Sequence, residues 1–255
     1  MSGLADDLTP PEDLVSSVGS GDFRRIGQEF LGYFTDLCDL QPSDHVLDVG
    51  CGIGRMAIPL VGYLDSAGRY AGFDIVEAGI TWCTDHISVQ YPNFNFARAD
   101  IYNARYNPGG RIQSCEFVFP YEDESFDFIF ATSVFTHMLP ADVEHYLMEI
   151  RRVLKPTGRT LTTFFLLNDE SVQLLEAGRS RFAFPHDQGV YRIARKEIPD
   201  ALVAYQEDFL MQIYEKAGLR DVTVHHGGWC GRELFLSQHD IVVSGRQVSA
   251  GASKR

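Results

Sequence analysis

Hydrophobic residues in this chain recur with two periods, one typical of strands and one typical of helices. Short runs rich in apolar and β-branched residues predict strands at 46–49, 69–75, 94–101, 128–135, 159–167, 222–226 and 239–243. Apolar residues at helical spacing predict helices that start near residues 22, 55, 77 and 140, and a further helix around Phe209 to Ala217 that ends at Gly218. Strands that alternate with helices indicate an α/β fold built on a mostly parallel sheet.

The most informative stretch is His45 to Leu64, which reads HVLDVGCGIGRMAIPLVGYL. A short strand runs into Gly50, Gly52 and Gly54, and a helical pattern follows. Glycines let the backbone turn sharply and approach a ligand closely, so this order predicts a nucleotide-binding turn. The spacing is G-x-G-x-G, which differs from the G-x-G-x-x-G of dinucleotide enzymes, and no G-K-[ST] follows.

Acidic residues stand at the ends of three predicted strands. Asp48 lies two positions before the first glycine, Asp74 ends the second strand, and Asp100 follows the third. A carboxylate at Asp48 is poorly placed for a pyrophosphate and better suited to an ammonium group. Asp74 lies at the distance along the chain where a carboxylate can accept hydrogen bonds from ribose hydroxyls.

These residues closely resemble the glycine-rich motif of class I methyltransferases that use S-adenosylmethionine. Two later segments, PYEDESFDF and RRVLKPTGR, resemble the corresponding half of the same family and occur in the family's order. The resemblance implies a Rossmann-like fold with a seven-stranded, mostly parallel sheet. It also implies helices on both faces of that sheet and an antiparallel C-terminal hairpin.

The resemblance further implies which residues hold the cofactor. Asp74 would accept both ribose hydroxyls, Asp100 would face the adenine amino group, and Ile101 would flank the ring. The full set expected to bind S-adenosylmethionine is Asp48, Gly50, Gly52, Gly54, Asp74, Ile75, Asp100, Ile101 and Ser133.

The chain length suits one large domain. We expect a mobile lead-in at residues 1–21, a single methyltransferase domain at 22–248 and a disordered tail at 249–255. Two segments are longer than connections inside compact domains usually are. These are 102–120 and 168–200, and we expect both to be insertions that cover the acceptor site.

The net charge and composition argue against some classes of binding partner. The formal net charge is −13, so the average field repels phosphate backbones and anionic membrane surfaces, and we expect neither nucleic acid nor a membrane as partner. The five cysteines include no C-x-x-C pair, the first residues are polar and acidic, and no apolar run is long enough to span a membrane. We therefore expect a cytoplasmic location, while the sequence indicates no oligomeric state.

Methyl transfer to a neutral hydroxyl needs a base, and histidine is well matched to that role near neutral pH. His137 follows the buried central strand, beside the crevice where ligands bind in parallel sheets, so it is the first candidate. His226, with its neighbour His225, is the second. The sequence has neither the P-P-[YWF] segment nor the Pro-Cys pair of base-modifying enzymes. These absences leave a small-molecule or saccharide methyltransferase. The segments TSVFTHM and LKPTGR resemble enzymes that modify hydroxyls of sugars or other natural products, and this resemblance implies such a hydroxyl as acceptor.

Several alternatives stay open at this point. The acceptor atom can be the nitrogen of a small metabolite, or the protein can be a non-catalytic regulator that binds S-adenosylmethionine. An oxidoreductase is a further rival, although its Tyr-x-x-x-Lys pair is missing. Magnesium is conceivable because Asp169, Glu170 and Asp187 offer oxygen ligands, but no spacing demands a metal site.

Overall fold

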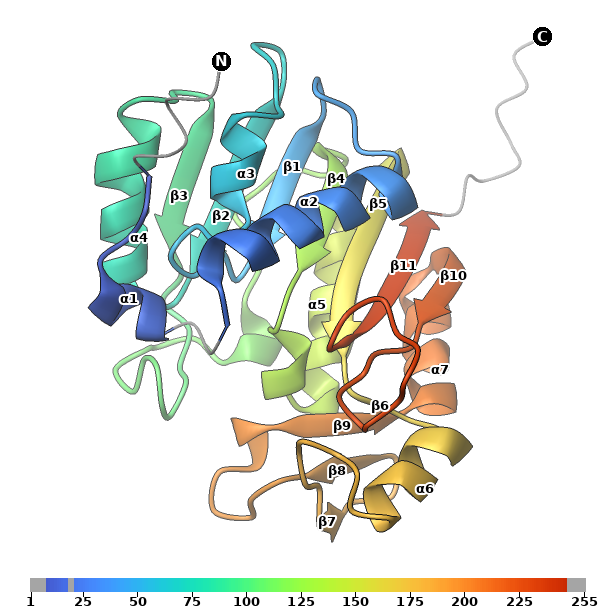
Figure 1. Ribbon diagram of the computed structural model, residues 1–255. Coiled ribbons are helices and arrows are strands. Elements are labelled where there is room, and N and C mark those ends of the chain that lie inside the picture. Colours follow the sequence, from blue (N-terminus) through green and yellow to red (C-terminus); the bar gives the residue numbers. More distant parts are fainter. Residues whose placement is uncertain (1–7, 18–20, 247–255) are drawn as a thin grey trace, which may run out of the picture. The chain divides into compact units, whose positions relative to one another are not determined.

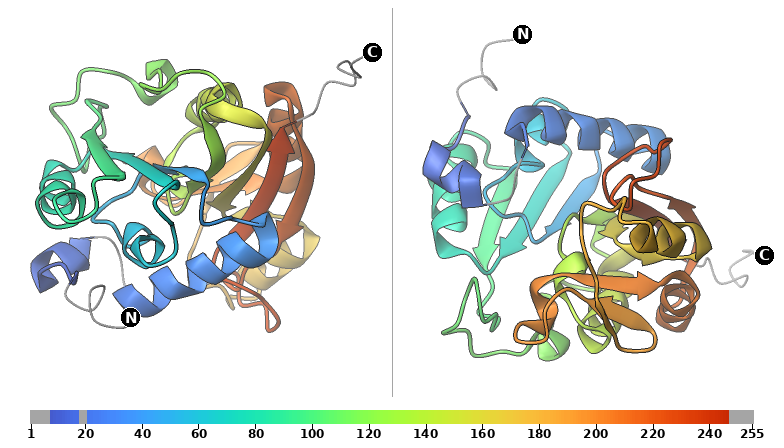
Figure 2. Two further views of the ribbon diagram at one scale, coloured as in Figure 1. Left: turned by 90° about the horizontal axis from the view of Figure 1, so that it is seen from above. Right: turned by 60° about the horizontal axis from the view of Figure 1, so that its bottom comes forward.

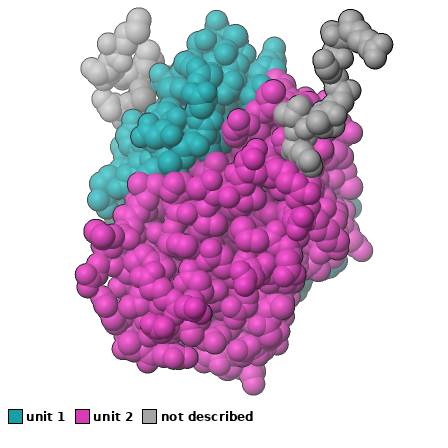
Figure 3. Space-filling view, turned by 90° about the vertical axis from the view of Figure 1, so that its right-hand side faces the viewer, with its two compact units in different colours: residues 1–113, 126–131 teal, residues 114–125, 132–255 magenta. Residues whose placement is uncertain are grey.

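The computed structural model describes residues 8–17 and 21–246, and the chain forms two compact units (Figures 1 and 3). The first unit contains the described residues up to Gln113 together with Phe126–Ala131. The second contains Ser114–Ser125 and the described residues from Thr132 onward.

The first unit is built on four parallel strands. β1 (His45–Val49) pairs with β2 (Arg69–Asp74) and with β4 (Phe126–Ala131), and β2 pairs with β3 (Phe94–Arg98). The helices of this unit are α1 (Glu12–Ser17), α2 (Phe23–Cys38), α3 (Ala57–Val61), α4 (Glu77–Cys83) and the π-helical turn η2 (Thr84–Ser88). Helices α2, α3 and α4 lie on the same face of these strands (Figure 2).

Helix α2 shows how the sequence sets the packing of this unit. Asp22 caps the helix by accepting a hydrogen bond from the Arg25 amide at 2.8 Å. Phe34 is fully buried and stacks on Phe130 of β4, with ring centroids 4.4 Å apart. Gly27 permits close approach to the segment before α3, because a Cβ there would lie 2.5 Å from the Arg55 carbonyl oxygen. The predicted helix is thus confirmed as a core element.

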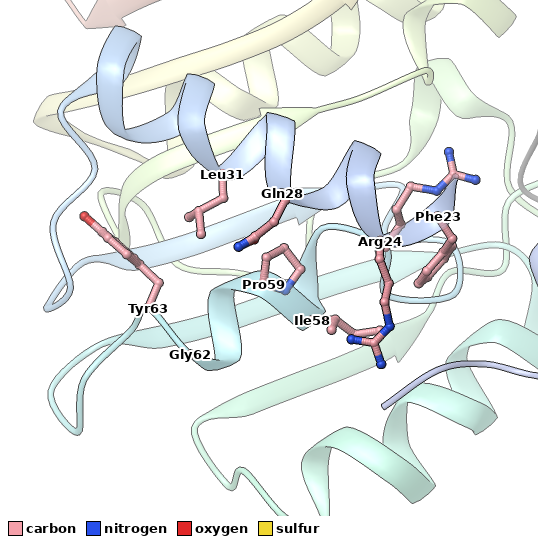
Figure 4. Close-up of a pocket in the computed structure, with 9 residues that line it drawn as sticks. Phe23, Arg24, Gln28, Leu31, Ile58, Pro59, Gly62 and Tyr63 are labelled. Atoms are coloured by element: carbon pink, nitrogen blue, oxygen red, sulfur yellow. The ribbon is translucent and has the colours of Figure 1, made fainter. Parts of the chain in front are cut away.

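An open groove remains between α2 and α3 (Figure 4). Its volume is about 420 Å³, and its lining includes Phe23, Gln28, Ile58 and Pro59. None of the residues that the sequence marks as cofactor-binding lines this groove. We therefore place the candidate site elsewhere, at the ends of the strands.

The second unit contains the rest of the sheet and its helices. β5 (Leu154–Phe164) pairs antiparallel with β11 (Asp240–Arg246), and β11 pairs antiparallel with β10 (Leu219–His225). Helices α5 (Pro140–Val153) and α7 (Glu207–Ala217) pack on each other. Gly218 ends α7 with a φ of 77°, the left-handed conformation that glycine adopts without strain. Two short 3₁₀ turns, η3 (Ser114–Glu116) and η4 (Phe135–His137), complete this part.

Residues 166–206 form a small sheet beside α6 (Asp169–Glu176), both drawn in yellow to orange in Figure 1. Its strands, in the order β6-β9-β8-β7, are Leu166–Leu167, Val203–Gln206, Tyr191–Ile193 and His186–Asp187, and the 3₁₀ turn η5 (Pro199–Ala201) precedes β9. A local core that includes Phe165, Phe184 and Trp229 packs against them. The expected insertion 168–200 is therefore mostly a packed substructure, and its role in covering the acceptor stays a prediction.

The seven strands of the main sheet follow the order β10-β11-β5-β4-β1-β2-β3. The predicted fold class is confirmed: the sheet is mostly parallel and ends in an antiparallel hairpin.

Several local predictions differ from the structure. The lead-in contains the short helix α1, which the sequence analysis did not anticipate, and the predicted tail 249–255 lies outside the described residues. Residues 114–116, inside the expected insertion 102–120, form a 3₁₀ turn. Strand β5 begins at Leu154, before the predicted start at residue 159.

Candidate active site

The glycine turn lies between β1 and α3. Gly50, Gly52 and Gly54 have φ values of 80°, 55° and 79°, the left-handed region that glycine adopts without strain. Close packing adds a further restriction, since a Cβ on Gly54 would lie 3.1 Å from both Cys83 Sγ and Ile87 Cδ1. The strand, turn and glycine spacing are therefore as the sequence predicts.

The amides of these three glycines already have protein partners. The Gly50 amide donates to the carbonyl oxygen of Phe73 at 2.9 Å. The Gly52 amide donates to Asp74 Oδ2 at 2.8 Å, and the Gly54 amide donates to the carbonyl oxygen of Cys51 at 3.0 Å. Helix α3 has only five residues and so offers little of the expected helix dipole. Phosphates bind where amides are free, so this turn is better suited to a ligand without phosphate.

Asp74 ties the turn to the end of β2. Its Oδ2 accepts from the Gly52 amide, and its Oδ1 accepts from the Val76 amide at 2.8 Å. Burial raises the pKa of this carboxyl group, and the backbone hydrogen bonds oppose that rise. A carboxylate has about four acceptor positions, so two amide bonds leave capacity for ligand hydroxyls. Ile75, the next residue, is half-buried.

Asp48 is buried and only partly satisfied. Its side chain is 1% exposed, and Oδ2 accepts a hydrogen bond from the Tyr70 hydroxyl at 2.7 Å. Among the described residues, Oδ1 has no hydrogen-bond partner. Burial raises the pKa of Asp48 to about 8, the Tyr70 hydrogen bond lowers it, and the charge of Asp74 raises it. A buried carboxylate oxygen without a donor marks a place where a ligand donor fits.

Asp100 follows β3 and is paired with Arg111. Oδ2 of Asp100 lies 2.5 Å from Nε of Arg111, and this hydrogen bond holds the pKa of Asp100 below its usual range. Ile101 is buried and bridges to Ile112. Arg111 could not be predicted as this partner, because nothing in the pattern of 102–120 singles out one arginine. The expected contact of Asp100 with adenine remains a prediction.

The remaining candidates belong to the second unit. Ser133 has a φ of 60°, and its amide donates to Thr163 Oγ1 at 2.7 Å. His137 ends η4, and its Nδ1 lies 2.7 Å from the carbonyl oxygen of Ala201. A carbonyl oxygen can only accept, so Nδ1 carries the proton and the ring lone pair is on Nε2.

His226 lies just after β10 and is held by an acidic partner. Its Nε2 lies 2.9 Å from Glu207 Oε2, and Asn168 Nδ2 donates to the same oxygen at 2.8 Å. The sequence analysis named His226 but missed Glu207 and Asn168. His225, its neighbour, is a strand residue in register with Ile241 of β11.

His239 packs against an aromatic side chain of this unit. Its ring stacks on Phe165, with centroids 5.1 Å apart. Burial lowers the pKa of His239 to about 4, and the charges of His137 and Arg181 act in the same direction. The pKa of His239 therefore lies below the physiological range.

Two of the three residues suggested as magnesium ligands are engaged in other contacts. Glu170 accepts from Arg232 at 2.9 Å, and Asp187 accepts from the Gly189 amide at 2.7 Å. Within residues 8–17 and 21–246, no three His, Cys, Asp or Glu side chains gather in a way that could hold a metal ion. Nor does that part of the chain contain a helix both long and apolar enough to cross a bilayer.

The five cysteines differ in accessibility. Cys38, Cys51, Cys83 and Cys230 are buried, Cys115 is exposed, and all five are free thiols. Burial raises the pKa of Cys51, at the centre of the glycine turn, well above its usual value, and raises that of Cys83 as well.

Residues 47–162 match a family described as a methyltransferase domain. Among curated proteins, a probable methyltransferase of Aspergillus luteorubrus, ltbC, is 30% identical over 123 residues, which cover 47% of this chain and 39% of that protein. A 2-phytyl-1,4-naphtoquinone methyltransferase of Trichormus variabilis is 27% identical over 158 residues, covering 61% of this chain and 60% of that protein. The chain thus spans less than two thirds of the length of these curated relatives.

Solved structures share the fold. The PH0226 protein of Pyrococcus horikoshii matches with a TM-score of 0.61 at 16% identity, covering 90% of this chain and 93% of that one. A phosphoethanolamine N-methyltransferase of Haemonchus contortus, solved with S-adenosylhomocysteine, matches with a TM-score of 0.56 at 14% identity. The match covers 86% of this chain and 53% of that one. The family match covers less than half of this chain, and the solved structures share its fold. A class I methyltransferase that uses S-adenosylmethionine remains the prediction.

The residues of the first unit fit that cofactor. The partnerless Oδ1 of buried Asp48 suits an ammonium group, and the protein-bound amides of the glycine turn suit a ligand without phosphate. Asp74 keeps acceptor capacity for hydroxyls. The individual contacts of Asp48, Asp74, Asp100 and Ser133 with S-adenosylmethionine remain predictions.

Proposed function

We propose that this protein transfers a methyl group from S-adenosylmethionine to a hydroxyl of a small molecule, a saccharide or another natural product. The observation that carries the proposal is the cluster formed by the glycine turn, Asp48 and Asp74, inside the segment that matches the methyltransferase domain. When bound, S-adenosylmethionine supplies an activated methyl group on a sulfonium sulfur, which is displaced directly by the acceptor.

The chain's own residues have three tasks in this proposal. Asp48 binds the ammonium group, and Asp74 binds the ribose hydroxyls, which orients the methyl group. A histidine takes the proton of the acceptor hydroxyl as the oxygen attacks. The histidine would then carry the proton that the acceptor hydroxyl releases.

Two histidines compete for the proton. His137 presents a lone pair on Nε2, because its Nδ1 donates to the Ala201 carbonyl oxygen. His226 presents a lone pair on Nδ1, because its Nε2 donates to the carboxylate of Glu207. We place His137 first because it follows the central strand β4, where parallel sheets bind ligands. The carboxylate beside His226 would stabilise an imidazolium, which makes it the strong second candidate.

The test is an acceptor screen with S-adenosylmethionine labelled on the methyl group. Monosaccharides, phenols, primary amines and quinols are incubated with the full chain, with and without a chelator, and the methylated product is located by NMR. Methyl ethers as products would support the proposal. Methylated amines or carbon atoms would replace the hydroxyl by another acceptor, and activity lost with the chelator would require a metal. Tight cofactor binding without any product would instead favour a regulator.

A further inference from the structure

Tyr70 reaches Asp48 from the neighbouring strand, across a glycine. In the parallel register of β1 and β2, Val46 is opposite Tyr70 and Asp48 is opposite Gly72. The Tyr70 hydroxyl therefore has to pass Gly72 to reach Asp48 Oδ2, at 2.7 Å. A Cβ on Gly72 would lie 2.9 Å from that hydroxyl, so the missing side chain leaves the space that the contact needs.

The tyrosine ring is fixed by its surroundings. Tyr70 is 1% exposed and stacks on Phe94, with centroids 5.0 Å apart and an interplanar angle of 17°. Phe96 contacts the ring at a centroid distance of 5.3 Å. A ring held in this way places its hydroxyl at one position, and the hydrogen bond restricts rotation of the Asp48 carboxylate. Tyr70 thereby determines where the partnerless Oδ1 of Asp48 lies.

The groups that interact electrostatically with Asp48 are Tyr70, Asp74, Cys51 and Cys83. None of the four carries positive charge. A buried carboxylate with one satisfied oxygen and acidic neighbours is best complemented by a cationic donor. Within the proposed function, the matching group is the ammonium of the amino-acid part of S-adenosylmethionine.

We propose that Tyr70 is a positioning residue of the cofactor site, whose hydroxyl orients Asp48 so that Oδ1 receives the ammonium group of S-adenosylmethionine. This inference rests on the proposed function. A positioning role and a purely structural role for Tyr70 predict different binding affinities. In the positioning role, loss of the tyrosine hydroxyl should weaken the binding only of ligands that carry the amino-acid part.

The Tyr70 hydrogen bond also favours the ionised form of Asp48, which opposes the effect of burial on its pKa. Removal of the hydroxyl therefore has two effects in the same direction. The carboxylate loses its fixed orientation, and a larger fraction of it is protonated near neutral pH. Both effects weaken an ion pair with an ammonium group.

The experiment is isothermal titration calorimetry of the full chain with two probes, S-adenosylhomocysteine and 5′-methylthioadenosine. The second probe keeps the adenosine and a thioether but lacks the amino-acid part. Tyr70→Phe should bind S-adenosylhomocysteine about ten-fold or more weakly, the scale of a hydrogen bond to a charged group. Its affinity for 5′-methylthioadenosine should stay within about two-fold of wild type.

The matched control is Tyr63→Phe. Its hydroxyl also donates a hydrogen bond within the first unit, to the Leu40 carbonyl oxygen, so it reports the general effect of losing a tyrosine hydroxyl. We expect both affinities to stay unchanged in this variant, and thermal melting checks the folding of each protein.

Distinct outcomes separate the two proposals. If Tyr70→Phe binds both probes more weakly to the same degree, or binds both as tightly as the wild type does, the positioning role is overturned. The proposed function is unaffected in either case, provided that the wild type binds the probes. If the wild type binds neither probe, the proposed function itself fails, and the role of Tyr70 fails with it.

Discussion

Glu207 Oε2 accepts a hydrogen bond from His226 Nε2 at 2.9 Å, between the first residue of α7 and the residue after β10. Because a carboxylate without a proton can only accept, the bond fixes the imidazole tautomer. His137 has the opposite tautomer, with its proton on Nδ1 beside the Ala201 carbonyl oxygen. The two candidate bases therefore present different ring nitrogens, and substitutions can separate them.

His137→Ala should lower turnover by about 10²- to 10⁴-fold if His137 takes the acceptor proton, the usual effect of losing a general base. Cofactor affinity should change little, and wild-type turnover should fall as pH drops through the histidine range. Single-turnover transfer of a labelled methyl group measures this. Glu207→Gln is the companion variant, because it weakens the support of His226 and leaves His137 in place, although it also changes the partner of Asn168. A normal rate in His137→Ala with a large loss in both His226→Ala and Glu207→Gln would assign the proton to His226.

Asp74→Ala should weaken binding of S-adenosylmethionine by about 1.5 to 3 kcal/mol, the scale of hydrogen bonds to a charged acceptor. The variant also removes the partner of the Gly52 amide, which loosens the turn. Asp74→Asn separates these effects, since its amide oxygen can still accept from one backbone N–H. Asp85→Asn, an exposed acid on η2, is the control. Calorimetry that shows equal affinities for wild type and Asp74→Ala would remove Asp74 from the ribose role.

The ligand-free protein should lose stability as pH rises, in part because of Asp48. Its folded-state pKa of about 8 lies above the ordinary value, so the folded state binds the proton more tightly than the unfolded state. This contribution is fully present below about pH 4 and is lost as pH rises through about 8, at about 1.4 kcal/mol per pH unit inside that window.

Melting curves of wild type and Asp48→Asn between about pH 5 and 8 test this expectation. Other buried carboxyls such as Asp240 shift in the same direction, so the difference between the two proteins is the relevant quantity. The melting temperature of Asp48→Asn should fall less steeply. Parallel curves would show that Asp48 is not the group that titrates.

Asp240→Ala should destabilise the second unit by about 3 kcal/mol or more, because unpaired buried donors cost about 1 to 3 kcal/mol each. The Asp240 carboxylate accepts from the amides of Leu166 and Gly227 and from the indole N–H of Trp229, at 2.7, 2.6 and 2.6 Å. Urea unfolding measures the change. The control is Asp208→Ala, because Asp208 is an exposed acid on α7. Asp221 on β10 is less suitable, because its positive φ makes a substitution there strained. A loss below about 1 kcal/mol would mean that water replaces the carboxylate.

The elements near the glycine turn could be predicted because their signals are local. Strand length, glycine spacing and an acid at the end of a strand are all visible within a few residues, and Gly52 and Asp74 do meet. The small sheet of residues 166–206 could not be predicted, because strands of two to four residues carry no readable period. β5 begins before Pro156 because the sequence Lys-Pro-Thr-Gly can also extend a strand end.

Side-chain partnerships escaped the sequence for a different reason. Tyr70 and Asp48 are 22 residues apart, and Glu207 and His226 are 19 apart, and each pair meets only through tertiary packing. A tyrosine that starts a strand looks like any core aromatic until the register places it beside Gly72. The sequence therefore gives the order of the functional groups along the chain and leaves their partners to the packing.

The unequal burial of the thiols makes Cys115 a natural attachment point for a reporter group. Thiol reagents need an accessible thiolate, and Cys38, Cys51, Cys83 and Cys230 are shielded by the fold. A maleimide dye should therefore label the folded protein at Cys115 alone, which mass spectrometry of a digest can verify, and labelling at Cys51 would contradict the buried turn. Because Cys115 belongs to the segment 102–120, the dye's emission would follow that segment as ligands are added, without any engineered cysteine.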